Sequence, residues 1–311
     1  MESSANRSSD QLAASNILRL ASLENVARTL AENGIRCIVL KGAAILLSDE
    51  SRMGTRPMTD VDLWVPFDPL PQVEKTLFGL GFHPRPDEPG EYELPGDRFS
   101  RIDISETVWF LPTEEIAAVW ERATVLSAHL RRLDGHDFIL HTIAHGAVHH
   151  GRWDDRWTQD LLDCRKLLPQ GIDGEILIER ARRWGLILPL AWAVTRTPWG
   201  RALPPGTVEG IKTETPPIRF RLYVFLRERP TLMTGHLLRF LLLPGWTRRF
   251  RHLRTSLLPK THFQRRRYGK LPLPVAYVLR PILLCLRLFR GTFQLVRGLV
   301  GSRPPLFPPS Y

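Results

Sequence analysis

The sequence predicts an α+β fold, in which a small mixed β-sheet with flanking helices is followed by an all-helical domain. Short apolar runs typical of strands alternate with short helical segments up to about residue 110, and the apolar spacing then becomes helical. The 311 residues, 43% of them hydrophobic, are enough for about two domains with cores of their own. We therefore divide the chain into residues 1–125, 126–240 and 241–311.

The predicted sheet domain begins with a helix. Between residues 11 and 33 apolar side chains recur at intervals near 3.6 residues, and Asn33-Gly34 ends the pattern. The elements predicted after it are a strand over 35–40, a short helix over 43–47, a strand over 59–65, a helix over 69–80 and a strand over 98–105. Residues 83–97, rich in proline, glycine and charged side chains, are predicted to form a loop.

The helical domain is predicted from three segments with helical spacing and short polar breaks, residues 137–153, 156–168 and 175–194. The three cysteines, Cys37, Cys164 and Cys285, are odd in number and far apart. This pattern fits neither a disulfide framework nor a paired-cysteine metal site, so we expect them to be buried as small apolar residues.

Positive charge is concentrated at one end of the chain. Of the 43 Lys and Arg residues, 16 lie between Arg229 and Tyr311, where there is no Asp or Glu. The remaining 27 basic and 32 acidic residues give the rest of the chain a net charge of −5. The sequence therefore combines a mildly acidic body with a strongly basic C-terminal region.

Two aspartates interrupt a segment that otherwise has the pattern of a buried strand. Within residues 59–65, Asp60 and Asp62 share one face because successive side chains alternate, and their backbones lie about 7 Å apart. Asp103 stands in a second strand-like apolar pattern. Phosphoryl-transfer sites with two divalent cations need carboxylate oxygens from two or three residues. On spacing alone, a solvent-exposed acidic pair on a sheet face is the simpler interpretation.

Lys41-Gly42, which precedes these acids, favours a phosphate site. A glycine directly after a strand lets backbone N–H groups approach a phosphate closely at the start of a helix, and the adjacent lysine supplies positive charge.

In order and spacing these residues resemble the polymerase-beta-like nucleotidyltransferase superfamily. The matching pieces are Lys41-Gly42, the run Arg56-Pro57-Met58 that leads to Asp60 and Asp62, and Asp103. The chain is more closely similar to the bacterial family of uncharacterised nucleotidyltransferases, whose downstream helix carries H-x-x-x-H followed by W-x-x-D. Here that element is His145, His149, Trp157 and Asp160, and the similarity covers about residues 11–170.

The resemblance implies an enzyme that transfers a nucleoside monophosphate from an NTP such as ATP to an unknown small molecule, peptide or protein, with Mg²⁺ or Mn²⁺ as cofactor. Asp60 and Asp62 would bind both metal ions, and Asp103 would share the second and take the acceptor's proton. The phosphates would be held by Lys41, Gly42, Ala43 and Arg56. Ala43 departs from the Gly-Ser or Gly-Gly of many superfamily members, which removes a hydroxyl that helps to grip phosphate.

Histidines recur every four residues in the first helical segment, at His141, His145 and His149, and would line one helix face. Zinc is the minor interpretation, because the glutamate of H-E-x-x-H is absent. We expect His145 and His149 to hydrogen-bond Asp160 or Asp163 on the next helix and so to fix the domains together. Orientation of the acceptor is an alternative role for them.

The basic C-terminal region has three open interpretations. Residues 275–300 are apolar but contain four arginines, too many for a transmembrane span. Residues 248–300 could lie on an anionic membrane surface, bind nucleic-acid phosphates, or pack against the acidic body. The apolar residues between the arginines favour the membrane surface over nucleic acid. The chain is expected to end in a disordered segment from residue 301.

Two functional hypotheses follow. The first is the metal-dependent nucleotidyltransferase, and the second is a catalytically inactive protein of the same fold that binds or scaffolds at a membrane surface. The three acids favour the enzyme, because clustered carboxylates repel one another and cost stability. Ala43 favours the inactive protein. The polar N-terminus without an apolar signal segment predicts a cytoplasmic protein, with peripheral attachment to the inner face of the cell membrane as an option.

Overall fold

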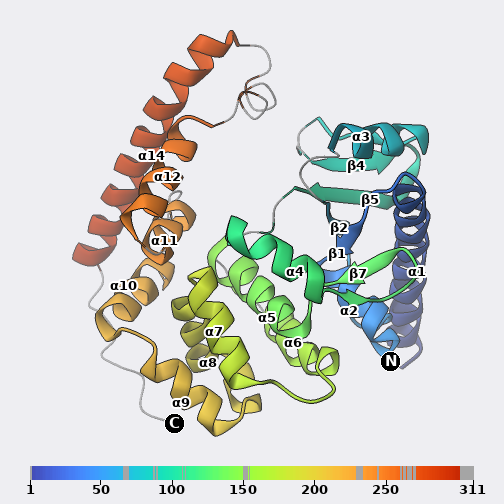
Figure 1. The fold of residues 1–311 in the computed structure, drawn as a ribbon, viewed down its shortest axis with the longest axis horizontal. Coiled ribbons are helices and arrows are strands. Elements are labelled where there is room, and N and C mark those ends of the chain that lie inside the picture. The colour runs from blue at the N-terminus through green and yellow to red at the C-terminus, as the bar shows by residue number, and fades with distance from the viewer. Residues whose placement is uncertain are drawn as a thin grey trace.

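In the computed structural model, a seven-stranded mixed sheet with flanking helices is followed by helices alone, which confirms the predicted fold class (Figure 1). The structure describes residues 2–65, 70–86, 88, 90–106, 108, 110–149, 153, 155–228, 234–243, 245–259, 261, 264, 268 and 271–301.

The sheet has the strand order β3-β4-β5-β2-β1-β7-β6. Its strands are β1 (Cys37–Val39), β2 (Val61–Trp64), β3 (His83–Pro84), β4 (Glu91–Leu94), β5 (Asp97–Ser105), β6 (Thr124–Val125) and β7 (Leu130–Arg132). The pairs β2–β5 and β1–β7 are parallel, and the other four pairs are antiparallel. Because β2 and β5 run in the same direction and in register, Asp62 lies directly opposite Asp103.

The structure places four strands where the sequence analysis expected none. β3 and β4 lie in the segment predicted to be a loop, because Tyr92 and Leu94 alternate with Glu91 and Glu93 and so can cover one face of the sheet edge. β6 and β7 extend the sheet to Arg132, past the boundary predicted at residue 125. β7 joins the sheet by pairing in parallel with β1.

Helices cover the sheet as the apolar patterns predict. α1 (Glu2–Glu32) begins earlier than predicted and packs against β1, β5 and α3 (Leu70–Gly79). α2 (Lys41–Ser48) follows β1 after a single residue and packs against β2. A short 3-10 helix, η1 (Glu50–Arg52), begins the loop that leads to β2.

The remaining elements are helical. They are η2 (Thr113–Glu115), α4 (Ile116–Arg122), α5 (Gly135–Ala144), the π-helix η3 (His145–His149), α6 (Asp155–Asp163), η4 (Cys164–Leu167), α7 (Gly174–Trp184), α8 (Ile187–Arg196), η5 (Pro198–Ala202), α9 (Pro205–Thr213), α10 (Pro217–Glu228), α11 (Thr234–Leu242), α12 (Trp246–Leu257) and α14 (Leu273–Gly301). α5 is buried along its whole length and contacts α6, α7 and α8, so it forms the centre of the helical domain.

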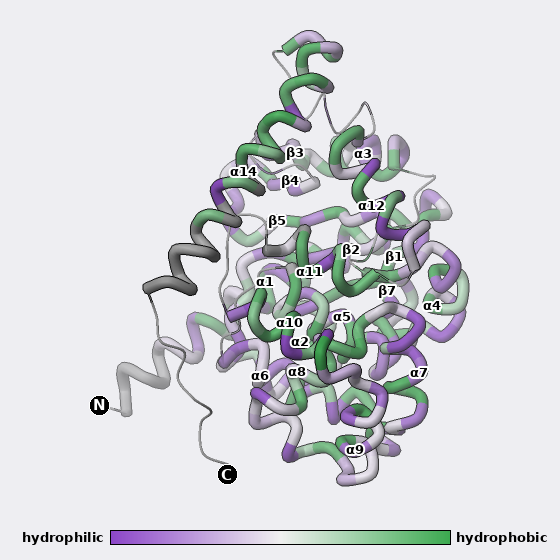
Figure 2. Tube along the Cα trace, turned by 90° about the vertical axis from the view of Figure 1, so that its left-hand side faces the viewer, coloured by the Kyte–Doolittle hydropathy of each residue, from purple (hydrophilic) through white to green (hydrophobic). Residues whose placement is uncertain are grey.

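One hydrophobic core runs from Leu20 in α1 to Leu242 in α11 and joins the sheet to the helical domain. Past Leu242, the buried apolar residues in the described part of the chain are Ala276 and Leu284. We call α12 and α14 the C-terminal arm; they lie side by side at the edge of the molecule, and Figure 2 shows apolar residues along both.

The C-terminal arm bears on the predictions about the cysteines and about a transmembrane span. Cys37 and Cys164 are buried as expected, but Cys285 in α14 is exposed. No helix within the described ranges is long and apolar enough to cross a membrane, as the arginines of α14 predict. The terminal segment predicted to be disordered lies, from residue 302, outside the described residues.

Candidate active site

A cleft of about 400 Å³ lies where the sheet domain meets α6 and the π-helix. Its lining comes from the β1–α2 junction, the loop before β2, the β3–β4 hairpin, β5 and the helical domain. It includes these residues singled out from the sequence: Lys41, Gly42, Arg56, Asp60, Asp62, Asp103 and His145. Residues far apart in the chain thus converge on one cleft.

The three aspartates of the cleft differ in burial. Asp62 is 5% exposed and lies beside Asp103 on the neighbouring parallel strand. Asp103 is half-buried. Asp60 precedes β2, is also half-buried, and accepts a hydrogen bond of 2.9 Å from the hydroxyl of Thr59. The exposed acidic pair that was the simpler interpretation therefore does not describe Asp62.

One lysine offsets this group of acids: Nζ of Lys41 forms an ion pair with Oδ1 of Asp62. Burial raises the pKa of Asp103 to about 7, and the nearby charge of Asp62 adds to the rise while Lys41 opposes it. Burial also raises the pKa of Asp62, although Lys41 acts in the opposite direction. The cleft lining holds five acids against Lys41, Arg56 and Arg156, and Asp160 already binds Arg56.

The junction between β1 and α2 is strained at Lys41, which has a φ of +48°. Residues other than glycine rarely adopt this left-handed backbone conformation, and backbone strain of this kind is concentrated at functional sites. The turn lets α2 begin directly after β1 and leaves Lys41 paired with Asp62. Ala43 lies one residue further on, is 1% exposed, and belongs to the hydrophobic core rather than to the cleft lining.

Gly42 makes room for an arginine. A Cβ atom at this position would lie 2.1 Å from Nη1 of Arg56, closer than any side chain tolerates. The guanidinium of Arg56 in turn donates from Nε and Nη2 to the two carboxylate oxygens of Asp160, each at 2.8 Å. Packing of Arg56 is therefore one reason for a glycine at position 42. The sequence suggested another, the close approach of a phosphate.

Two buried ion pairs connect the sheet domain to α6. The first is Arg56 with Asp160, and the second joins Arg52 and Asp163 at 2.9 Å. Gln159 also donates to Asp163, at 3.0 Å. Both carboxylates that we expected the histidines to bind thus have arginine partners, and these pairs fix the two domains together.

The histidine face begins in the helical domain and reaches the cleft at His145. The ring of His145 lies 6.0 Å from that of His141 and 5.1 Å, edge to face, from that of Trp157. From His145 the α-helix widens into a π-helix, a local change that is frequent at functional sites. His149 is the last residue of that π-helix, and its side chain lies outside the described residues.

Several cleft residues escaped the sequence analysis. Glu88 and Glu91 come from the missed hairpin, where Glu91 stands opposite Asp103 in register and binds Arg85 at 2.6 Å. Arg156 comes from α6, and its guanidinium lies 5.2 Å from the ring centre of Trp157, a cleft residue that the sequence analysis did single out. Alternation of acids and apolar residues over 91–94 was the available signal for Glu91.

The acids suit a hard divalent cation, although they are not assembled around one. Across the described ranges, no three His, Cys, Asp or Glu side chains are placed to hold a metal ion together. The donor chemistry fits Mg²⁺ or Mn²⁺, because the carboxylates of Asp60, Asp62 and Asp103 line the same cleft and two of them have raised pKa values that a cation would lower. Binding would require a cation to displace Nζ of Lys41 from Asp62.

Comparison with known proteins gives one match. A family model described as "uncharacterised nucleotidyltransferase" matches residues 3–197, which include the sheet domain and every lining residue of the cleft. Searches of curated proteins and of solved structures gave no match.

Proposed function

This chain belongs to the uncharacterised nucleotidyltransferase family, and we propose that it transfers a nucleoside monophosphate from an NTP to an acceptor with Mg²⁺ or Mn²⁺ as cofactor. One observation carries the proposal. Asp62 and Asp103 lie side by side on neighbouring parallel strands, in a cleft with Asp60, and Lys41 is bound to Asp62. An uncompensated group of buried acids costs stability and is therefore expected where a cation binds.

Three features of the cleft suit the triphosphate. Lys41 supplies a positive charge that becomes available once a cation binds Asp62. Gly42 lies in the first turn of α2, where backbone N–H groups precede the helix's own hydrogen bonds and attract phosphate oxygens. Arg156 lines the opposite wall. We assign Arg56 a positioning role, because Asp160 already binds its guanidinium.

The proposed reaction forms a bond between an acceptor oxygen or nitrogen and the α-phosphorus of the NTP, and breaks the bond from that phosphorus to the pyrophosphate oxygen. Asp60, Asp62 and Asp103 would hold the cations, which when bound lower the pKa of the acceptor group and offset the charge of the phosphates. Asp103 is the candidate for taking the acceptor's proton, because its carboxylate lies beside Asp62 and lines the cleft that would hold the cations. His145, on the far wall, is the candidate for orienting the acceptor.

The alternative function is a catalytically inactive scaffold. Two observations favour it: the ion pair between Lys41 and Asp62 neutralises the deepest acid without a cation, and Ala43 places a methyl group in the core where a phosphate-gripping hydroxyl is expected. In that case the acids would be inherited from an active ancestor. The alternative predicts that nucleotide binding is independent of divalent cations.

Calorimetric titration of the four NTPs, with and without Mg²⁺, separates these two functions. We expect Mg²⁺-dependent binding to the wild-type chain and a loss of at least about 100-fold in affinity in the double variant Asp60→Asn/Asp62→Asn, since both removed charges would contact the cation. The matched control is Asp10→Asn/Glu209→Gln, which neutralises two exposed acids on α1 and α9. Equal binding by both double variants would contradict the proposal and favour the scaffold.

A further inference from the structure

An exposed apolar stripe runs along α14 of the C-terminal arm. Its residues recur every three or four positions, as one face of a helix requires, and each is between 48% and 74% exposed: Val275, Val278, Ile282, Leu286, Phe289 and Phe293. From Val275 to Phe293 the helix rises about 27 Å, so the stripe is a long continuous surface. Isolated exposed apolar residues are ordinary, but a stripe of this length indicates a binding surface.

The stripe faces away from the rest of the molecule. On the opposite side of α14, Ala276 and Leu284 are buried, and Nε of Arg280 donates to the backbone oxygen of Ser256 in α12 at 2.7 Å. These contacts fix the helix against α12 with its apolar stripe outward. The stripe therefore points outward because α14 packs its other side against α12.

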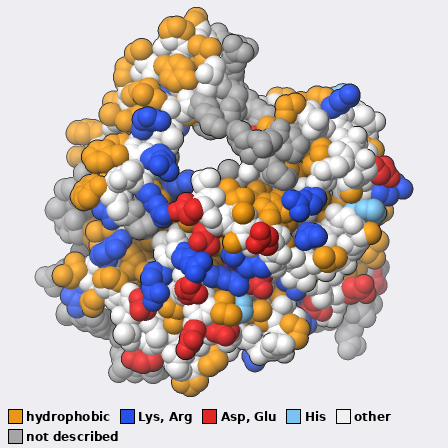
Figure 3. Space-filling view, viewed as in Figure 1, with side chains coloured by type: hydrophobic (Ala, Val, Ile, Leu, Met, Phe, Trp, Pro, Cys, Tyr) orange, Lys and Arg blue, Asp and Glu red, His pale blue; other side chains and the backbone are white. Residues whose placement is uncertain are grey.

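α12 adds a second exposed apolar face. Trp246, Phe250 and Leu253 stand four and three residues apart and are 65%, 64% and 45% exposed. The arginines Arg251 and Arg254 of the same helix are exposed between and beside them. Figure 3 shows this mixture of hydrophobic and basic side chains over the arm.

The charge of the arm is of one sign. No Asp or Glu occurs after Glu228 in the sequence, and Arg290 of α14 is exposed close to the stripe. Within the described residues, Glu114 of the body pairs with Arg248 of the arm. The exposed arginines beside the apolar stripe therefore call for a negatively charged partner that also accepts apolar side chains.

We propose that the C-terminal arm binds the surface of an anionic phospholipid bilayer, with α14 lying in the plane of the interface. The stripe would enter the boundary between headgroups and acyl chains, and the exposed arginines would contact lipid phosphates. The exposed arginines favour an anionic partner, and a second copy that met the stripe with its own arm would bring the same positive charge. Nucleic acid supplies the negative charge, but no surface for six exposed apolar side chains.

Vesicle co-sedimentation of the full chain tests this inference independently of the transferase activity, since the variants leave the cleft unchanged. We expect wild-type protein to sediment with vesicles of equimolar phosphatidylglycerol and phosphatidylcholine, and to remain in solution with phosphatidylcholine alone. Binding should weaken as salt rises, because salt screens the arginine–phosphate attraction. The variant Ile282→Ser/Phe289→Ser should lower the partition coefficient by about 10-fold or more, since it removes two side chains from the buried stripe.

The matched control makes the same two changes at exposed positions away from the arm. Ile218 on α10 is 84% exposed and Phe78 on α3 is 51% exposed, so Ile218→Ser/Phe78→Ser should bind vesicles like the wild type. Circular dichroism of both variants checks that they are folded. Absence of wild-type binding to anionic vesicles, or equal loss in both double variants, would overturn the proposal. So would a wild-type dimer in light scattering that the stripe variant converts to a monomer, because a second copy would then cover the stripe.

Discussion

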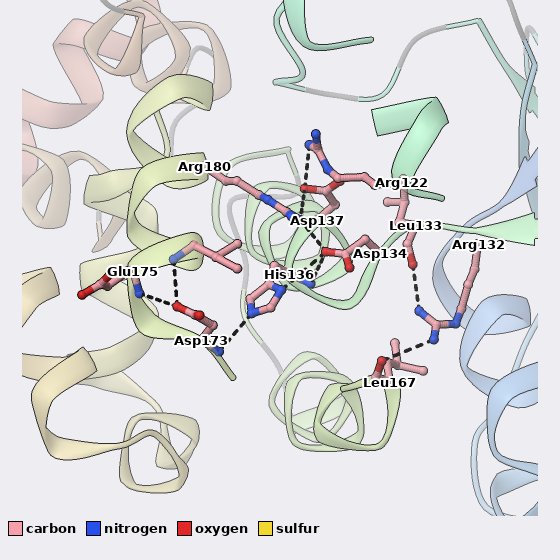
Figure 4. Close-up of polar contacts among 11 residues, drawn as sticks. Arg122, Arg132, Leu133, Asp134, His136, Asp137, Leu167, Asp173, Glu175 and Arg180 are labelled. Carbon is pink, nitrogen blue, oxygen red and sulfur yellow. Dashed lines mark hydrogen bonds and ion pairs between the residues drawn. The ribbon is translucent and has the colours of Figure 1, made fainter. Parts of the chain in front are cut away.

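Two groups of acids in this molecule, one around the buried Asp62 and one around the buried Asp137, have opposite surroundings. In the cleft, Lys41 is the cation bound to Asp62, while Asp60 and Asp103 share the same space. At the start of α5, two arginines bind Asp134 and Asp137 from neighbouring helices (Figure 4). Arg122 of α4 contacts Asp137 at 2.6 Å and Arg180 of α7 contacts it at 3.0 Å, so this second group joins three helices.

The electrostatics of the two groups differ accordingly. Burial would raise the pKa of Asp134, but hydrogen bonding to His136 and the charge of Arg180 outweigh it and lower that pKa. Burial raises the pKa of Asp137, with Arg122 and Arg180 opposing it. In the cleft, neighbouring acids add to the effect of burial and bring the pKa of Asp103 to about 7. Burial of an acid therefore points to function where cations of the protein itself do not match its charge.

The largest effect on stability is expected at the compensated group. Asp137→Asn removes the shared carboxylate and leaves Arg122 and Arg180 without it, which should lower the free energy of unfolding by about 3 kcal/mol. Urea unfolding measures this change. The control is Glu179→Gln, which breaks an exposed pair with Arg183 and should cost at most about 0.5 kcal/mol. Equal effects of the two substitutions would contradict the claim that the acids at the start of α5 stabilise the fold.

Removing a carboxylate from the cleft is expected to raise the free energy of unfolding, whereas removing that of Asp137 lowers it. Because the pKa of Asp103 is about 7 in the folded protein and about 4 in the unfolded chain, the folded protein binds more protons between these values, and its stability falls as pH rises through this window. Asp103→Asn removes the cost of ionisation and should stabilise the protein at pH 8, where the carboxylate is ionised, with no gain at pH 4.

Thermal unfolding in the presence of a chelator, at both pH values, measures the effect of Asp103→Asn. Mg²⁺-dependent nucleotide binding should decrease in the same variant, so stability and function would change in opposite directions. A variant that is less stable than the wild type at pH 8 would show that Asp103 is a structural acid like Asp137.

A smaller effect is expected from the glycine that packs against Arg56. Gly42→Ala places a methyl group in contact with the guanidinium and should cost about 1–2 kcal/mol by overpacking, with a loss of nucleotide binding because the start of α2 shifts. Gly206→Ala is the matched control, since no atom lies within 4 Å of the added Cβ and alanine favours the helix. Thermal unfolding and calorimetry of both variants test whether Arg56 positions the phosphate-binding turn. A neutral Gly42→Ala would show that Arg56 can move without consequence.

Much of the cleft could be predicted from the sequence because its acids break local patterns. Asp62 and Asp103 each interrupt an apolar strand, and parallel neighbouring strands place such residues together. Arg156 and Glu91 could not be found in the same way, since arginine on a helix and glutamate in a proline-rich segment have common structural roles. Their place in the cleft depends on how α6 and the β3–β4 hairpin pack, which involves contacts far apart in the chain.

The sequence by itself determined the α+β order of elements, the position of the acidic strands and the basic C-terminal region, because these follow from local periodicity and composition. Only the tertiary structure decided that Arg56 and Arg52, rather than any local partner, bind Asp160 and Asp163, and that the stripe of α14 faces outward. The reason is physical: periodicity fixes which face of an element is apolar, whereas the partner of a charge and the covering of a face depend on long-range packing.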